Sequence, residues 1–355
     1  MLLFFNGPGR MKCFDPKYNS LPKAELHCHL EGAIRTSTLI DIAREFGLEL
    51  PAWDVDSLDP HVKVFEQLKD LATVLEAFAI AQNSITSPAV VGRLARELFE
   101  DSAAQNIKLL EVRFSPDWAF SRHGVDWDAA LEALVQAKHE AAARFGMAIG
   151  LIAISSRSLG VGSCEKTVNW AIRRREHVQG IDLADGEAAH PIREFANPVR
   201  KAADAGLKIT VHSGEDTPAS AVVETILAVN PDRIGHGTHS IHDPSAIELL
   251  KERGITLEMN PWSNYLTSSV KRIEEHPLKQ LFDLGVKVTI NSDDPELLDT
   301  NLNNEFRIAH EVLGMTFDEL QTCTNYAFEA SFIPEGQKRA VKNRCCSLNE
   351  PKIRR

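Results

Sequence analysis

The sequence predicts a closed (β/α)8 barrel, a TIM barrel, with a helical insertion after its first strand. Short apolar runs alternate with helical stretches through the last two thirds of the chain, and one more apolar run near the start completes a set of eight. The chain has 355 residues, of which 43% are hydrophobic and 25% are charged, as expected of one large α/β barrel. We therefore expect residues 1–355 to form a single domain.

The eight expected strands are short runs of mostly apolar residues. They cover residues 24–27, 108–114, 147–154, 180–183, 207–211, 233–235, 255–259 and 286–290. Between them, helical periodicity predicts helices near residues 126–145, 165–176, 191–205 and 219–229. A further helix is expected to begin at Pro244, with Asp243 as its N-cap, and to end before Gly254.

A long segment, residues 32 to 106, separates the first two expected strands, and two apolar stripes with helical spacing fall within it. The first stripe is Val62, Phe65, Leu68, Leu71, Leu75 and Phe78, and the second is Val91, Leu94, Ala95, Leu98 and Phe99. Ser87 and Pro88 are expected to start the second helix. Since this insertion follows a strand's carboxyl end, where barrels carry their chemistry, we expect it to cover the active site.

The charge balance and the apolar runs exclude several classes of partner. Fifty acidic against 39 basic residues give a net charge of −11, which argues against nucleic-acid and anionic-membrane partners. The longest apolar run, residues 145–154, has about half the length that a membrane span needs. Six scattered cysteines and the lack of a secretory signal at the start indicate reduced thiols and the cytoplasm. The oligomeric state is left open.

Polar side chains gather directly after several of the expected strands. His27 and His29 are two residues apart on one strand, so their imidazoles can share a metal ion, while Cys28 points into the barrel wall. Further clusters follow other strands at residues 212–215, 235–237 and 291–295. The strand ends of a barrel converge on one site. Taken alone, the histidine pair also fits an ordinary strand end, and Asp293-Asp294 also fits a helix N-cap.

These positions suggest one metal centre with an adjacent substrate site. Three neutral imidazoles and a carboxylate suit one Zn²⁺ per chain with an open position for water, and the ligands are expected to be His27, His29, His212 and Asp293. The metal lowers the pKa of that water toward 7. Glu215 can exchange protons with a substrate, His236 can orient or deprotonate the water, and Asp294 can hydrogen-bond the substrate. The residues alone leave open an amide, a phosphoester or an amidine.

Five motifs, in this order and spacing, resemble the adenosine deaminase family of the amidohydrolase superfamily. They are residues 26–32 (Leu-His-Cys-His-Leu-Glu-Gly), 211–215 (Val-His-Ser-Gly-Glu), 235–237 (Gly-His-Gly), 260–267 (Asn-Pro-Trp-Ser-Asn-Tyr-Leu-Thr) and 291–295 (Asn-Ser-Asp-Asp-Pro). The resemblance extends from about Lys23 to Phe332. It implies zinc-dependent deamination of adenosine and 2′-deoxyadenosine to inosine and 2′-deoxyinosine, with release of ammonia, in purine salvage. The implied partner is a small purine nucleoside.

The resemblance also implies a role for each site residue. The family's zinc ligands correspond to His27, His29, His212 and Asp293. Glu215 would protonate N1 of the purine, His236 would position the water, and Asp294 would contact the water and N7. His29 would also lie beside the substrate, and the Glu31 carboxylate would hydrogen-bond the ribose. The alternative for Glu31 is a solvated loop carboxylate.

The end of the fourth strand departs from the family's pattern. The family has Leu-Ala-Gly-Asp-Glu there, with the glycine amide donating to purine N3, whereas this chain has Leu-Ala-Asp-Gly-Glu at residues 183–187. Either Asp185 or Gly186 can supply that amide. The segment has no lysine, which disfavours a bridged two-metal site. Two other functions stay open: deamination of a related aminopurine, such as adenine or an N6-substituted AMP, and binding without turnover.

Overall fold

The computed structural model describes residues 11–68 and 78–348. In this part of the chain, eight parallel strands form one sheet in chain order from β1 to β8. The strands are β1 (Lys23–His29), β2 (Ile107–Phe114), β3 (Ala148–Ser156), β4 (Gly180–Ala184), β5 (Lys208–Ser213), β6 (Arg233–His236), β7 (Thr256–Met259) and β8 (Val288–Ile290). All eight lie where the sequence predicts them. Their bounds differ from the expected ones by at most two residues.

The segment after β8 returns to β1 and nearly closes the sheet into a barrel. The backbone N–H of His29 donates to the Asp293 carbonyl at 2.8 Å, and the N–H of Asp293 donates to the His27 carbonyl at 3.1 Å. Cys28 and Asp293 accordingly form a parallel bridge. The predicted (β/α)8 fold is therefore confirmed. Its closure also places His27, His29 and Asp293 beside one another.

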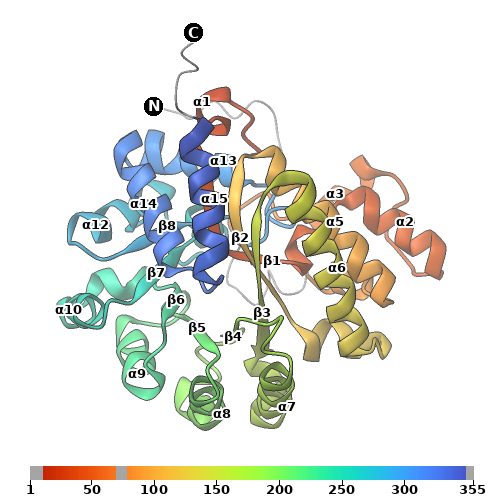
Figure 1. Cartoon of the computed structure of the whole chain (residues 1–355), viewed down its shortest axis with the longest axis horizontal. Helices are drawn as coiled ribbons and strands as arrows, with labels where there is room; N and C mark the ends of the chain where they lie inside the picture. Colours follow the sequence, from red (N-terminus) through yellow and green to blue (C-terminus); the bar gives the residue numbers. More distant parts are fainter. Residues whose placement is uncertain (1–10, 69–77, 349–355) are drawn as a thin grey trace.

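Helices alternate with the strands and form the outer ring in Figure 1. The helices that precede β2 to β8 are α5 (Pro88–Ala104), α6 (Trp127–Phe145), α7 (Gly160–Arg173), α8 (Ile192–Asp204), α9 (Ala219–Val229), α10 (Pro244–Arg253) and α12 (Leu278–Asp283). The expected end signals are in place: the Ser87 side chain caps α5, Asp243 caps α10, and Gly254 ends α10 in a left-handed conformation. Among the described residues, no helix is long and apolar enough to cross a membrane.

The first apolar stripe of the insertion is not one helix. After α2 (Thr36–Phe46), helix α3 (Val55–Val62) ends where the stripe begins, and residues 63–68 are not helical. The N–H of Val64 donates to the Leu297 carbonyl at 2.7 Å, and that of Leu68 donates to the Leu266 carbonyl at 2.8 Å. These tertiary hydrogen bonds override the local periodicity. Leu71 and Leu75 lie outside the described residues.

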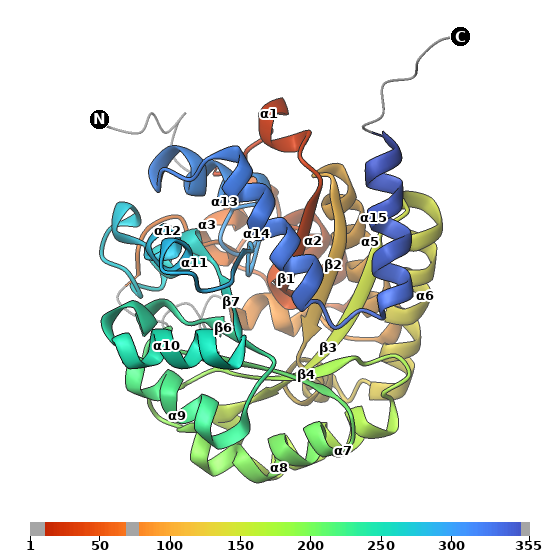
Figure 2. The same cartoon turned by 60° about the vertical axis from the view of Figure 1, so that its left-hand side comes forward.

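Helices at the C-terminal end of the chain cover the side of the barrel where the strands begin. The helices not predicted individually from the sequence are α2, α3 and α12, together with α1 (Pro16–Asn19), α11 (Pro261–Leu266), α13 (Leu302–Arg307), α14 (Phe317–Ala330) and α15 (Glu335–Leu348). Figure 2 shows α14 beside β1 and α15 beside β2, and an apolar cluster that includes Ala24, Leu109 and Phe328 joins them. The polar clusters lie at the other ends of the strands.

Candidate active site

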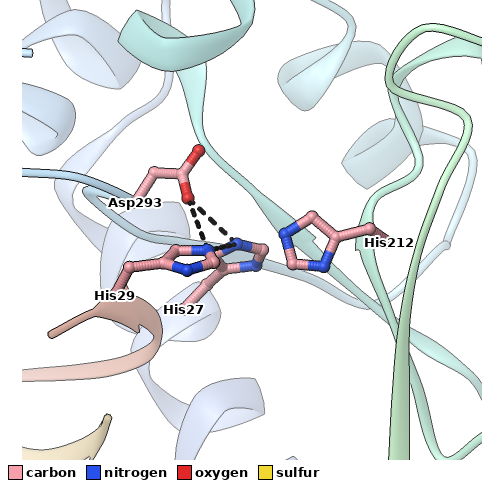
Figure 3. Close-up of side chains that lie close together, drawn as sticks. All are labelled: His27, His29, His212 and Asp293. Atoms are coloured by element: carbon pink, nitrogen blue, oxygen red, sulfur yellow. Dashed lines mark hydrogen bonds and ion pairs between the residues drawn. The ribbon is translucent and has the colours of Figure 1, made fainter. Parts of the chain in front are cut away.

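Three imidazoles and one carboxylate converge at the carboxyl ends of β1, β5 and β8 (Figure 3). One donor atom from each of His27, His29, His212 and Asp293 lies within 4.8 Å of all the others. The Oδ1 of Asp293 is 3.1 Å from Nε2 of His27 and 3.2 Å from Nε2 of His29. Cys28 is fully buried in the apolar core instead. The four donors match the preferences of a Zn²⁺ ion, so the predicted ligand set fits a metal.

Buried carboxylates orient two of these imidazoles. The Nδ1 of His27 lies 2.8 Å from Glu258, and the Nδ1 of His212 lies 3.0 Å from Asp182. A carboxylate at Nδ1 keeps the proton on that nitrogen and leaves the Nε2 lone pair free for a metal. The guanidinium of Arg113 forms ion pairs with both carboxylates, at 2.6 Å to Asp182 and 2.6 Å to Glu258.

The charged network continues toward the opposite end of the barrel. Arg233 pairs with Glu258 at 2.5 Å and with Glu111 at 2.6 Å. Glu111 in turn accepts hydrogen bonds from the Ser331 hydroxyl and the Phe332 N–H, just after α14. The side chains of Glu111, Arg113, Asp182, Arg233 and Glu258 have no solvent exposure. Sequence reasoning missed these residues, although all of them are charged residues within buried strands.

Glu215 lies beside this four-residue cluster in the loop after β5, and Glu187, from the segment after β4, holds the backbone of that loop. Glu187 accepts the backbone N–H groups of Gly214 at 2.7 Å and of Glu215 at 3.1 Å. The Glu215 carboxyl lies 3.4 Å from Nε2 of His236. Burial, followed by the nearby Asp293 and Glu187 carboxylates, raises the pKa of Glu215 well above its usual value. Glu215 is therefore suited to hold a proton and to donate it.

Asp294 packs against the turn that follows β1. A Cβ atom on Gly32 would lie 1.9 Å from Oδ1 of Asp294, so any larger residue at this position would force the Asp294 side chain to move. That Oδ1 atom is buried and has no hydrogen-bond partner among the described residues. Burial and the neighbouring Asp293 carboxylate raise the pKa of Asp294 well above its usual value. The atom is thus available to a ligand.

A cavity at this end of the barrel connects these groups. Its described lining includes the predicted residues His29, Glu31, Asp185, His212, Glu215, His236, Asp293 and Asp294. Sequence reasoning missed most of the remaining walls, which are Phe78, Gln82, Ser115, Trp118, Ile154, Ser156, Ala184, Ser263 and Thr267. No lysine or arginine is among the described lining residues.

Glu31 is buried, so the alternative of a solvated loop carboxylate is wrong. Its Oε1 accepts the backbone N–H of Ser115 at 2.7 Å, and its Oε2 has no partner among the described residues. Burial raises the pKa of Glu31 to about 7. At the fourth strand end, Asp185 lines the cavity with a left-handed φ of 74°, whereas Gly186 is not among the lining residues.

Comparisons with known proteins show which family the chain resembles. The sequence profile described as Adenosine deaminase matches residues 22–347. The adenosine deaminase of Erwinia tasmaniensis is 33% identical over 326 residues, which cover 92% of this chain and 98% of that protein. The solved structure of the adenine deaminase of Arthrobacter aurescens is also similar, with a TM-score of 0.85 and 25% identity over 92% of this chain and 98% of that one.

Two further solved structures bear on the metal and on the ligand. An amidohydrolase of Burkholderia ambifaria with bound zinc has a TM-score of 0.83 and 25% identity, covering 93% of this chain and 91% of that one. The N6-methyl-AMP deaminase of Arabidopsis thaliana has a TM-score of 0.80 and 28% identity, covering 94% of this chain and 98% of that one. Because the profile spans nearly the whole described barrel, the chain belongs to the adenosine deaminase family.

Proposed function

We propose that the protein hydrolyses adenosine and 2′-deoxyadenosine to inosine and 2′-deoxyinosine with release of ammonia, using one Zn²⁺ per chain. The observation that supports this best is a buried Glu215 with a raised pKa in the same cavity as a four-residue metal cluster. A binding protein without turnover has no chemical need for such an acid. The buried free cysteines Cys13, Cys28, Cys164 and Cys323 are consistent with a cytoplasmic enzyme.

The proposed reaction is addition of water to C6 followed by loss of the amino group. The chemistry supplied by a bound Zn²⁺ is Lewis-acid activation of the water. Glu215 donates its proton to N1, which draws electrons from C6 and allows the water oxygen to bond there. Glu215 then regains a proton from that water. The C6–N6 bond breaks, and the remaining hydroxyl proton leaves with N6 as ammonia.

The remaining acceptors of the cavity suit the purine and a sugar. Asp294, with its raised pKa, can share a proton with N7 of the purine. The backbone amide of Asp185 is the better candidate for N3, because Asp185 lines the cavity. Glu31 Oε2 and Gln82 Oε1 are buried without partners among the described residues, and both can accept hydrogen bonds from hydroxyl groups. A nucleoside supplies such hydroxyls, and free adenine does not.

The same lining disfavours a phosphorylated substrate. A dianionic phosphate next to the Glu31 carboxyl would be repelled once that group ionises, and no described cationic side chain of the lining would compensate. Deamination of free adenine or of an N6-substituted nucleotide remains the second candidate, since solved relatives are named for these activities. The unpartnered acceptors favour adenosine over both.

An ultraviolet assay on the zinc-loaded protein tests this substrate assignment. Adenosine, 2′-deoxyadenosine, adenine, AMP and N6-methyl-AMP are compared in parallel by the absorbance change of the purine. We expect the two nucleosides to have the highest kcat/KM values, and Glu31→Gln to weaken adenosine use while narrowing the gap to AMP. A kcat/KM for AMP or adenine equal to or above that for adenosine would refute the assignment.

A further inference from the structure

His236 is flanked by two asparagine side chains on the side away from the cavity. The Nδ1 of His236 lies 3.1 Å from Nδ2 of Asn260 and 2.9 Å from Nδ2 of Asn264. Both asparagines belong to the segment that enters and forms α11. The other ring nitrogen, Nε2, lies 3.4 Å from the Glu215 carboxyl. The asparagines thus contact only the nitrogen that does not face the acid.

The orientation of the Asn264 amide is fixed by its own partners. Its Oδ1 accepts from the Thr238 hydroxyl at 3.1 Å and lies 3.0 Å from Nε2 of His276. The Nδ1 of His276 accepts the backbone N–H of Leu278 at 3.3 Å, so a neutral His276 carries its proton on Nε2 and donates to Asn264. Burial lowers the pKa of His276 to about 3, which keeps the ring neutral. The Nδ2 of Asn264 must therefore face His236.

The Asn260 amide has a fixed orientation as well. Its Nδ2 lies 3.2 Å from the backbone carbonyl oxygen of Glu258, which can only accept. If the amide were flipped, two oxygens would face each other at that distance. The Nδ1 of His236 therefore faces two donors and must present its lone pair to them. In the neutral ring the proton then lies on Nε2.

We infer that Asn264 and His276 are positioning residues that fix His236 as the Nε2–H tautomer, so that it donates a hydrogen bond into the cavity and accepts none. The tautomer follows from the contacts alone, but its consequence for the attacking water rests on the proposed function. His236 holds the attacking water by donating to its oxygen, and it cannot take a proton from that water. The acceptor for the water proton is Glu215, which is ionised after its transfer to N1.

Replacing Asn264 by aspartate puts a hydrogen-bond acceptor, in place of a donor, next to Nδ1 of His236. The carboxylate of Asn264→Asp still accepts from Thr238 and His276, but it presents an acceptor to Nδ1 of His236. We expect Nδ1 to gain a proton in this variant. The kcat for adenosine is expected to fall at least about tenfold, while KM changes much less, because water positioning and not substrate binding is lost.

Long-range ¹H–¹⁵N NMR of the imidazoles in the zinc-loaded protein reads the tautomer directly. The signals of His236 are identified by their loss in His236→Gln. We expect a protonated Nε2 and an unprotonated Nδ1 in the wild type, and a protonated Nδ1 in Asn264→Asp. A wild-type His236 protonated on Nδ1, or an Asn264→Asp variant with the wild-type pattern, would overturn the inference.

A matched pair at His276 keeps the test decisive if Asn264→Asp does not fold. His276→Gln retains a donor for Asn264 Oδ1, so we expect His236 to keep the Nε2–H tautomer. His276→Leu removes this donor, so we expect His236 to be protonated on Nδ1 in part of the molecules. Identical His236 spectra in the two variants would contradict the assigned role of His276. Adenosine turnover is measured separately, so a wild-type Nε2–H tautomer without turnover would refute the proposed function and leave the tautomer assignment intact.

Discussion

At the scale of single residues, the environment of Glu215 matters most for the proposed reaction. Its carboxyl is buried beside Asp293 and Glu187, and each of these surroundings disfavours the ionised form. The raised pKa determines how activity depends on pH. The protonated form of Glu215 is populated below the pKa of the folded protein and is lost as the pH rises through it. Turnover that depends on a proton from Glu215 should decline on that alkaline side.

We therefore predict that Glu215→Gln keeps its zinc but loses at least about 10²-fold in kcat, because glutamine preserves the shape of the side chain and cannot donate an acidic proton. Metal analysis and steady-state kinetics on the same preparation check this. Near-normal turnover of the zinc-loaded variant would show that Glu215 is not the acid.

Asp182 contacts Nδ1 of His212 and forms an ion pair with Arg113, so its charge is expected to matter for metal binding. Asp182→Asn is expected to weaken zinc binding by about 10- to 100-fold, because the imidazole loses a charged partner that strengthens it as a ligand. Competition with a chelator measures this. Asp204→Asn, at the exposed end of α8, is the matched control, and equal zinc affinity in the two variants would argue against the orienting role.

The sequence allowed the cluster of His27, His29, His212 and Asp293 to be predicted but not the residues that orient its imidazoles. His27, His29 and His212 lie at strand ends, and parallel strand ends in a barrel are expected to converge. Arg113 and Glu258 also lie near the ends of their strands, but the side chains of a strand alternate between its two faces, so the local sequence does not show which way these two point. Only the register of the closed barrel shows that both point inward and meet.

At the scale of elements, the turn after β1 determines where Asp294 can lie. Gly32→Ala would place a methyl group within 1.9 Å of the Asp294 carboxyl, and that side chain would have to move. We expect a loss of about 1–3 kcal/mol in the free energy of unfolding and a marked fall in kcat/KM for adenosine.

Thermal or chemical denaturation together with kinetics checks the Gly32→Ala prediction. Gly162→Ala in α7 is the control, because a Cβ atom there meets nothing within 4 Å and alanine favours helix. If Gly32→Ala were as active and as stable as Gly162→Ala, the turn would not constrain Asp294.

Helix boundaries were predictable where the chain carries its own end signals, as at Ser87 before α5 and Gly254 after α10. The interpretation of Val62, Phe65 and Leu68 as one helix was wrong because residues 63–68 form hydrogen bonds with segments about 200 residues away or more. Local periodicity carries no information about such partners. The same limit explains why α11, which presents Asn264 to His236, was not predicted.

At the scale of the whole molecule, the alternation of apolar runs and helices was sufficient to predict the barrel, because a parallel sheet requires crossover helices. What the alternation does not reveal is the charged interior. A chain of ion pairs runs from Glu111 through Arg233, Glu258 and Arg113 to Asp182, and so links the C-terminal helices to the metal cluster. Buried charges are stable only when every partner is present, so metal binding depends on the closed barrel.

We propose above that one zinc ion per chain, held by His27, His29, His212 and Asp293, supports hydrolysis of adenosine. The most direct test of this proposal is a titration of zinc into the chelated protein with adenosine turnover as the readout. We predict no turnover in the metal-free protein and a linear rise that ends at one equivalent of zinc. In His27→Ala and Asp293→Ala we expect no rise at that loading. A break at two equivalents, turnover without metal, or no adenosine turnover at any loading would contradict the account.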